Sequence, residues 1–374
     1  MLDTVTSAAR TVTNTVQKVQ EQPKPQPVQP QNTQPATTQN VASGSASEKN
    51  GLDSNLATGL IKKGFGIISN AVNSAVERRQ EIERIAKENA PILVLPEGKY
   101  NLPTNPEDYI ANSRLREDVS FWKDKELGNN TDGKTDNNFS PTDVGNMNNE
   151  NAFLDLDNDA RGTLGDKNAP IFYRFEEGKD GKPPTMTYHF FYPYNDAPSA
   201  HGVDFNHEGD WERVTYELDP DTLKPVNALL SAHEGGERIP FGELQKDSNT
   251  NRPFVFPANG SHANYAEPGT SSLPFGAKDY TVSDKNNDGI INENDGAVLF
   301  DTQRDLREVT SQNWYPNNDS KGIHWGEIGE IKYSTGPYGP SSQKGSVEIE
   351  EKESKSLLDR FKDSLIIANL SYGR

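Results

Sequence analysis

The six residues HEGDWE at positions 207–212 place a histidine, three acidic residues and a tryptophan side by side. If residues 210–212 are extended, Asp210 and Glu212 point to one face of the strand and Trp211 points to the other. Gly209 permits a bulge or a tight bend that would turn His207 toward the carboxylates. We therefore predict a site for a divalent cation, Ca²⁺ or Mg²⁺, at this strand. The competing interpretation is a hydrogen-bonded, solvated strand end.

A second cation motif is the sequence DKNNDGIINEND at residues 284–295. Oxygen-bearing side chains fall at loop positions 1, 3, 5, 9 and 12, a glycine falls at position 6, and position 7 would offer its backbone carbonyl, as in calcium loops. The predicted ligands are Asp284, Asn286, Asp288, Ile290, Asn292 and Asp295. We expect a structural Ca²⁺ that stabilises an inserted loop. The alternative is an Asx-rich turn.

Three histidines lie in short polar segments flanked by Gly or Ser: His207, His233 and His262. With Glu212, the last two are candidate acid–base or ligand groups of a metal-dependent hydrolase. A nucleophilic role for Ser231 or Ser261 has little support, because the sequence contains no nucleophile-elbow pattern. The other three histidines are interpreted as packed or surface residues: His189, His201 and His324.

The composition narrows the class of protein. The 374 residues carry a net charge of −18, which disfavours binding to nucleic acid. Hydrophobic residues make up 32% and the mean hydropathy is −0.85, so part of the chain is expected to be disordered. The chain has no cysteine and no apolar run long enough to span a membrane, and its first residues lack the apolar segment that we would expect of a Sec-type signal peptide. We expect export without such a signal or delivery by a dedicated apparatus, with a cytoplasmic protein as the alternative.

Two terminal regions differ from the rest of the chain. Residues 1–50 are rich in Pro, Gln and Thr and are predicted to be disordered. Residues 51–89 carry an apolar stripe typical of an amphipathic helical segment, which could pack on protein or lie at a membrane surface. Residues 346–374 are predicted to form a C-terminal amphipathic helix. We expect residues 1–90 to bind a delivery apparatus or a structural partner.

Residues 90–345 alternate short strand patterns with Pro, Gly and Asn turns. The strand patterns include IFYRF, TMTYHFFYPY, DWERVTYEL, VNALLSA and FVFP. Short strands without intervening helical periods predict a mainly β fold, an antiparallel two-sheet sandwich of jelly-roll type. The calcium loop near residues 284–295 would be an insertion in this domain, and a short helix is expected near residues 106–114.

Several sequence blocks of this region occur in one order: PEGKYNLPTNPEDYIANSRLR, HFFYPYNDAP, HEGDWERVTYEL, LLSAHEGGE, NGSHANYAEPG and GPYGP. Together they resemble the vacuolar protein sorting-associated protein 62 family over about residues 90–340. Three of these blocks, HFFYPYNDAP, HEGDWERVTYEL and LLSAHEGGE, also resemble the necrosis- and ethylene-inducing-peptide-like cytolysins, whose heptapeptide is GHRHDWE. Its first histidine matches His207, its last three residues match 210–212, and Gly209 replaces its second histidine.

The cytolysin resemblance implies a β-sandwich whose cation is held by His207, Asp210, Glu212 and an upstream aspartate. Asp196 is the candidate for that aspartate, and Asp204 is the rival. The resemblance also implies recognition of membrane lipid or glycan head groups by a toxin or effector. We weigh this function against two others, a metal-dependent hydrolase of a lipid, glycan or phosphoester and a non-catalytic sorting or structural module.

Overall fold

The computed structural model describes residues 73–120, 123–196, 206–233, 235–272, 278–285, 291, 293–317, 320–327 and 336–342. The chain divides into two compact units, Met1–Glu81 and Ile82–Arg374. Residues 73–89 are helical. The predicted disorder of residues 1–50, most of the helical segment at 51–89 and the helix at 346–374 lie outside the described residues.

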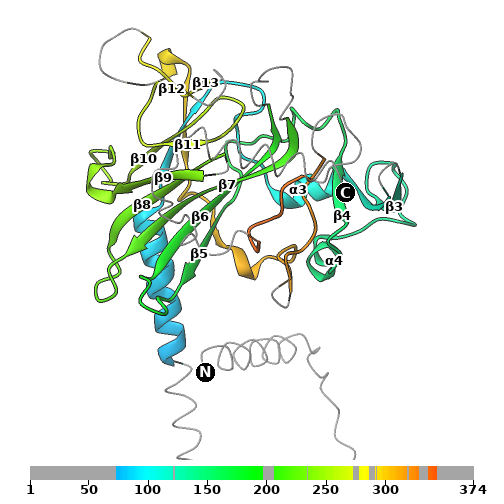
Figure 1. Ribbon diagram of the computed structural model, residues 1–374, viewed down its shortest axis with the longest axis horizontal. Helices are drawn as coiled ribbons and strands as arrows, with labels where there is room; N and C mark the ends of the chain where they lie inside the picture. Colours follow the sequence, from blue (N-terminus) through cyan, green and yellow to red (C-terminus); the bar gives the residue numbers. More distant parts are fainter. Residues whose placement is uncertain are drawn as a thin grey trace, which may run out of the picture. The chain divides into compact units, whose positions relative to one another are not determined.

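The larger unit is built on a six-stranded sheet with the order β15-β5-β6-β7-β8-β9 (Figure 1). Its strands are β15 (Leu306–Glu308), β5 (Ile171–Glu176), β6 (Thr185–Asn195), β7 (His207–Leu218), β8 (Pro225–Ala232) and β9 (Gly235–Pro240). The β6 and β7 strands pair antiparallel over their whole length, from Thr185 opposite Glu217 to Asn195 opposite His207. This long ladder fixes the residues of HEGDWE to one end of the sheet.

A four-stranded sheet has the order β11-β10-β1-β14. It consists of β11 (Asn264–Tyr265), β10 (Phe254–Pro257), β1 (Ile92–Pro96) and β14 (Ala297–Asp301). A separate hairpin joins β12 (Thr270–Ser272) to β13 (Lys278–Tyr280). Short 3₁₀ turns occur at Phe241–Glu243, Glu293–Asp295 and Val309–Ser311.

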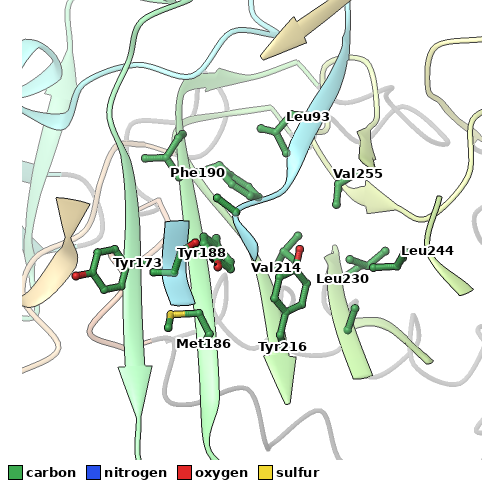
Figure 2. Packing of buried hydrophobic residues seen from close by; sticks show 14 of the residues in the cluster. Leu93, Tyr173, Met186, Tyr188, Phe190, Val214, Tyr216, Leu230, Leu244 and Val255 are labelled. Atoms are coloured by element: carbon green, nitrogen blue, oxygen red, sulfur yellow. Dashed lines mark hydrogen bonds between the residues drawn. The ribbon is translucent and has the colours of Figure 1, made fainter. Parts of the chain in front are cut away.

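The main hydrophobic core lies between the two larger sheets, which confirms the β-sandwich predicted from the sequence. Figure 2 shows Tyr188 and Phe190 of β6 and Val214 of β7 facing Leu93 of β1 and Val255 of β10. The even-numbered residues of β6 and β7 supply this core because successive side chains of a strand point to opposite faces. Ile85 and Ala86 also belong to it, so the last helical turns before β1 pack in the sandwich.

The opposite face of the central sheet packs against a second, aromatic core. Trp211 stacks on Phe191 with ring centroids 4.4 Å apart, and Trp314 and Trp325 complete the group. The predicted short helix is confirmed as α3 (Pro106–Ala111), which contributes Tyr109 to this core. The second face is therefore buried and apolar at Phe191 and Trp211, whereas farther along it carries the buried polar residues Thr187, His189 and Thr215.

A three-stranded sheet stands to one side of the central sheet (Figure 1). It contains β3 (Lys123–Asn129), β2 (Ser113–Ser120) and β4 (Ala152–Leu156), with the helix α4 (Pro141–Asn146) between β3 and β4 in sequence. The alternation pattern did not predict this sheet, since residues 125–168 are rich in Asn, Asp and Gly. Two further departures are the parallel pairs β1–β10 and β15–β5 in the otherwise antiparallel sandwich.

Candidate functional site

The start of β7 places the two predicted carboxylates on one face. Asp210 lies opposite Tyr192 of β6 and Glu212 lies opposite Phe190, whereas Trp211 points into the aromatic core behind. Asp210 is 5% exposed and Glu212 is 8% exposed. The period-two prediction for residues 210–212 is thus confirmed, and both acidic groups are buried deeply enough to need partners.

Gly209 bends the strand without shifting its register. Its φ is 61°, a value that an L residue other than glycine adopts only with strain, and the β6–β7 pairing continues through it. The bend accompanies a close backbone approach, because a Cβ on Gly209 would lie 1.7 Å from the Trp325 carbonyl oxygen. His207 Nε2 lies 3.9 Å from Asp210 Oδ1, so the bend brings the imidazole near the first carboxylate, as predicted.

Asp210 is held by a histidine from another part of the chain. Its Oδ2 lies 2.8 Å from Nδ1 of His262, and Nε2 of the same ring lies 3.1 Å from the Tyr100 carbonyl oxygen. A carbonyl oxygen only accepts, so Nε2 carries a hydrogen and one further proton lies between Nδ1 and Asp210. His262 is fully buried and stacks on the Tyr192 ring with centroids 3.8 Å apart.

Glu212 is held by two neutral side chains. The Ser231 hydroxyl of β8 donates to Glu212 Oε2, and Asn264 Nδ2 of β11 lies 3.4 Å from the same oxygen. Burial, followed by the nearby charge of Asp210, raises the pKa of Glu212 well above its usual range. A bound cation would favour the ionised form of Glu212 and so oppose this rise of the pKa.

A second cluster surrounds Asp279 of β13. Its carboxylate accepts hydrogen bonds from Ser261 Oγ at 2.8 Å and from the Tyr265 hydroxyl at 2.7 Å, and it lies 2.8 Å from His233 Nε2. Burial acts to raise the pKa of Asp279, but these three partners outweigh it and lower the pKa below its usual value. The Ser231 and Ser261 hydroxyls both donate to carboxylates and not to histidine, an arrangement that does not activate a nucleophile.

The predicted cation ligands are brought together only in part. His207, Asp210 and Glu212 share the start of β7, whereas Asp196 is exposed and its N–H donates to the Gly260 carbonyl oxygen. The rival Asp204 lies outside the described residues. Across the part of the chain that the structure describes, no three His, Asp or Glu side chains are grouped closely enough to hold a metal ion by themselves.

The predicted calcium loop is described at its two ends. Asp295, at loop position 12, is 1% exposed, and its Oδ1 accepts a 2.9 Å hydrogen bond from the Lys285 amide at position 2. Asp284 is also described. The other predicted ligands lie outside the described residues: Asn286, Asp288, Ile290 and Asn292. Calcium binding by this loop stays a prediction, with the loop ends held close together.

Glu208 is a buried acid that the sequence analysis did not single out. Arg161 donates to Glu208 Oε1 from Nε at 2.9 Å and from Nη2 at 2.8 Å, and the Leu156 amide donates to Oε2 at 2.9 Å. Burial raises the pKa of Glu208 to about 7, although Arg161 and the Leu156 amide act to lower it. This ion pair ties β7 to the segment after β4, next to the cation-site candidates.

We expect the stability of the protein to fall as the pH rises from 4.5 to 8, partly through Glu208. Its folded pKa of about 7 exceeds the ordinary value of 4.5, so the folded state retains a proton that the unfolded state has released. The contribution is fully present below pH 4.5 and is lost as the pH rises through 7. Urea unfolding in the presence of chelator measures this effect. Between pH 4.5 and pH 8, the free energy of unfolding of wild type should fall by about 3 kcal/mol more than that of Glu208→Gln. Parallel pH profiles would contradict the prediction.

Comparison with known proteins supports the first resemblance. No protein-family model matches the chain. Vacuolar protein sorting-associated protein 62 of Saccharomyces cerevisiae is 24% identical over 238 residues, which cover 54% of this chain and 50% of that protein. The putative vacuolar protein sorting-associated protein TDA6 of the same yeast is 32% identical over 106 residues, 23% of this chain and 22% of that protein. The predicted similarity to the protein 62 family is confirmed, and the chain spans half or less of these relatives.

The solved structures that match the chain include Necrosis and Ethylene inducing Protein 2 from the causal agent of cocoa's Witches Broom disease. The match has a TM-score of 0.28 and 17% identity, and covers 51% of this chain and 71% of that one. The sandwich fold is established here by the two packed sheets themselves. No helix among the described residues is both long and apolar enough to cross a membrane.

Proposed function

We propose that this protein is an effector or toxin whose β-sandwich engages membrane lipid or glycan head groups through a divalent cation at the start of β7. The observation that carries the proposal is the burial of Asp210 and Glu212 on one strand face, beside His207. Glu212 has only neutral hydrogen-bond partners and Asp210 shares a proton with His262, so a divalent cation would stabilise both buried carboxylates. The HEGDWE segment, similar to the cytolysin heptapeptide, favours the same function.

The donor atoms fit a hard divalent ion. His207 Nδ1 lies 3.2 Å from the Glu208 carbonyl oxygen and so carries the hydrogen, which leaves the lone pair on Nε2. The Nε2 atom lies 3.9 Å from Asp210 Oδ1. Two atoms that share one Ca²⁺ at 2.3–2.6 Å lie within about 5 Å of each other, so both can bind the same ion. Glu212 would supply the second carboxylate, and Ca²⁺ or Mg²⁺ fits this oxygen-rich set.

The residues of this chain would perform three tasks in binding a head group. Asp210 and Glu212 would hold the cation, which supplies a positive charge for a phosphate oxygen or a sugar hydroxyl. His262 would fix the Asp210 carboxylate through Nδ1, and Ser231 would fix Glu212. A calcium ion in loop 284–295 would stabilise the nearby hairpin. Residues 1–90 would bind a delivery apparatus or a structural partner.

Dye release from liposomes tests the main function. We expect wild type to release dye in the presence of Ca²⁺ or Mg²⁺ from at least one of a set of liposomes with phosphatidylcholine, phosphatidylserine or glycosylated sphingolipid head groups. Chelator, or the triple change His207→Ala, Asp210→Asn and Glu212→Gln, should reduce release to background. The charge-matched control Asp221→Asn with Glu237→Gln changes two exposed acids and should release dye as wild type does.

Release that survives both chelator and the triple change in a folded protein would refute the role of the cation. Circular dichroism and the thermal midpoint establish folding of each variant before the assay. The same wild-type vesicles can be extracted and analysed by mass spectrometry for cleaved lipid or glycan. New products would favour a hydrolase over a binder.

The hydrolase is the second candidate because of the His233–Asp279 pair. The side chain of His233 is 33% exposed and its Nε2 faces a fully buried carboxylate, so Nε2–H donates and the Nδ1 lone pair is left for a proton. An oriented imidazole of this kind is suited to take a proton from water as a general base. Product formation that is lost in His233→Gln, with dye release unchanged, would separate this activity from binding.

A further inference from the structure

Asn264 has a buried amide whose two ends have different surroundings. Its Nδ2 lies near three atoms: Glu212 Oε2 at 3.4 Å, the Arg213 carbonyl oxygen at 3.5 Å and Ser231 Oγ at 3.2 Å. Its Oδ1 is buried and has no hydrogen-bond partner among the residues that the structure describes. A buried carbonyl oxygen without a donor is costly, so this atom calls for an explanation.

A flip of the Asn264 amide does not provide one. A flip would direct Oδ1 at the Arg213 carbonyl oxygen, which only accepts, and at Glu212 Oε2, which already accepts from the Ser231 hydroxyl. The network therefore fixes Nδ2 toward these acceptors and Oδ1 away from them. Asn264 is 1% exposed, so bulk water does not supply the missing donor.

Tyr192 has a second such oxygen on the same side of the sheet. Its hydroxyl is buried and also lacks a partner within the described ranges, and its ring stacks on His262. Tyr192 lies opposite Asp210 in the β6–β7 ladder, while His262 and Asn264 bond to Asp210 and Glu212 in turn. The two orphaned oxygens thus belong to the surroundings of the two carboxylates.

We propose that Asn264 Oδ1 is a neutral oxygen ligand of the divalent cation held by Asp210 and Glu212, and that Tyr192 Oη bonds to a water molecule on that cation. This rests on the proposed cation site and adds two residues to it. Asn264 then positions Glu212 with one end of its amide and binds the cation with the other. With His207, the set has three oxygen ligands and one imidazole nitrogen, and this excess of oxygen favours Ca²⁺ or Mg²⁺ over the softer zinc ion.

Calorimetric titration of the full chain with Ca²⁺ tests the assignment. The background carries Asp284→Ala and Asp288→Ala, so that the predicted loop does not contribute to binding. We expect Asn264→Asp to bind Ca²⁺ about tenfold more tightly, because affinity rises with the number of charged ligands. Asn264→Leu and Tyr192→Phe should each weaken binding by about tenfold. Tyr192→Phe should not lower the thermal midpoint in chelator, because it removes an unpaired hydroxyl.

The two substitutions at Asn264 separate a ligand from a structural clamp. If the residue only clamps Glu212, Asn264→Asp loses the Nδ2 donor and weakens Ca²⁺ binding as Asn264→Leu does. That result would overturn the role of Asn264 as a ligand but leave the cation site itself in place. Tyr192→Phe with unchanged affinity would overturn the role of that hydroxyl. The background protein itself, with Asn264 and Tyr192 unchanged, should take up Ca²⁺ or Mg²⁺. If it takes up neither ion, the cation site is overturned together with the proposed function.

Discussion

Replacement of Gly209 by alanine is expected to destabilise the protein by about 4 kcal/mol or to prevent folding. Two costs combine, because a Cβ would lie 1.7 Å from the Trp325 carbonyl oxygen and the φ of 61° disfavours any L side chain. The contact is backbone on backbone, so no side chain can rotate away to relieve it. Urea unfolding at neutral pH measures the loss.

Gly242→Ala is the matched control for Gly209→Ala. No atom lies within 4 Å of the position of its added Cβ, and its φ is outside the left-handed region. Alanine there should leave the free energy of unfolding unchanged or raise it by about 0.5 kcal/mol, through a more restricted unfolded chain. Equal stabilities of the two variants would show that β7 and the Trp325 segment are not in close contact.

Residues 325–327 hold the HEGDWE segment through further backbone contacts. The Glu208 amide donates to the Glu327 carbonyl oxygen at 3.0 Å, and a Cβ on Gly326 would lie 2.4 Å from Glu208 Cβ. The Trp325 amide donates to Pro337 in the GPYGP block at 2.8 Å. Segments more than 100 residues apart therefore position the bend at Gly209, and through it His207.

The sequence predicted those parts of the fold that a period of two reveals. In β6 and β7 the alternation placed Asp210, Glu212 and Trp211 on the faces where the structure has them. In contrast, β2 has the sequence SRLREDVS, in which charged residues replace the apolar period. Its Arg116 forms ion pairs with Asp155 at 2.8 Å on the neighbouring strand β4 and with Asp124 on β3, partners that no local pattern identifies.

In the candidate site, too, features set by neighbouring residues could be predicted, whereas partners from distant segments could not. The spacing of residues 207–212 predicted the carboxylates and the bend, but the partner of Asp210 is His262, 52 residues further along the chain. Asn264 and Asp279 carried no signal of their own, because one amide and one acid in short polar segments are common. His262 and Asn264 are two residues apart, as are their partners Asp210 and Glu212. This equal spacing is the sequence feature that would have predicted the pairing of the two segments.

Replacement of Arg161 by methionine is expected to cost about 3 kcal/mol at pH 8. The substitution keeps an apolar stem but removes both hydrogen bonds to Glu208, whose side chain is 2% exposed, and leaves a buried negative charge. Because the pKa of Glu208 is already about 7, the acid can take up a proton instead, so the cost should be smaller at pH 5. Urea unfolding at the two pH values measures both effects.

A double-mutant cycle attributes this cost to the ion pair. Glu208→Gln removes the charge but keeps an oxygen for the Leu156 amide, so Arg161→Met should cost much less in that background. Arg238→Met is the matched control, because Arg238 also makes two bonds to one carboxylate, Glu217, but its side chain is 46% exposed. That loss should stay below about 1 kcal/mol. Similar losses at both arginines would mean that burial of Glu208 does not control the strength of the pair that holds the start of β7.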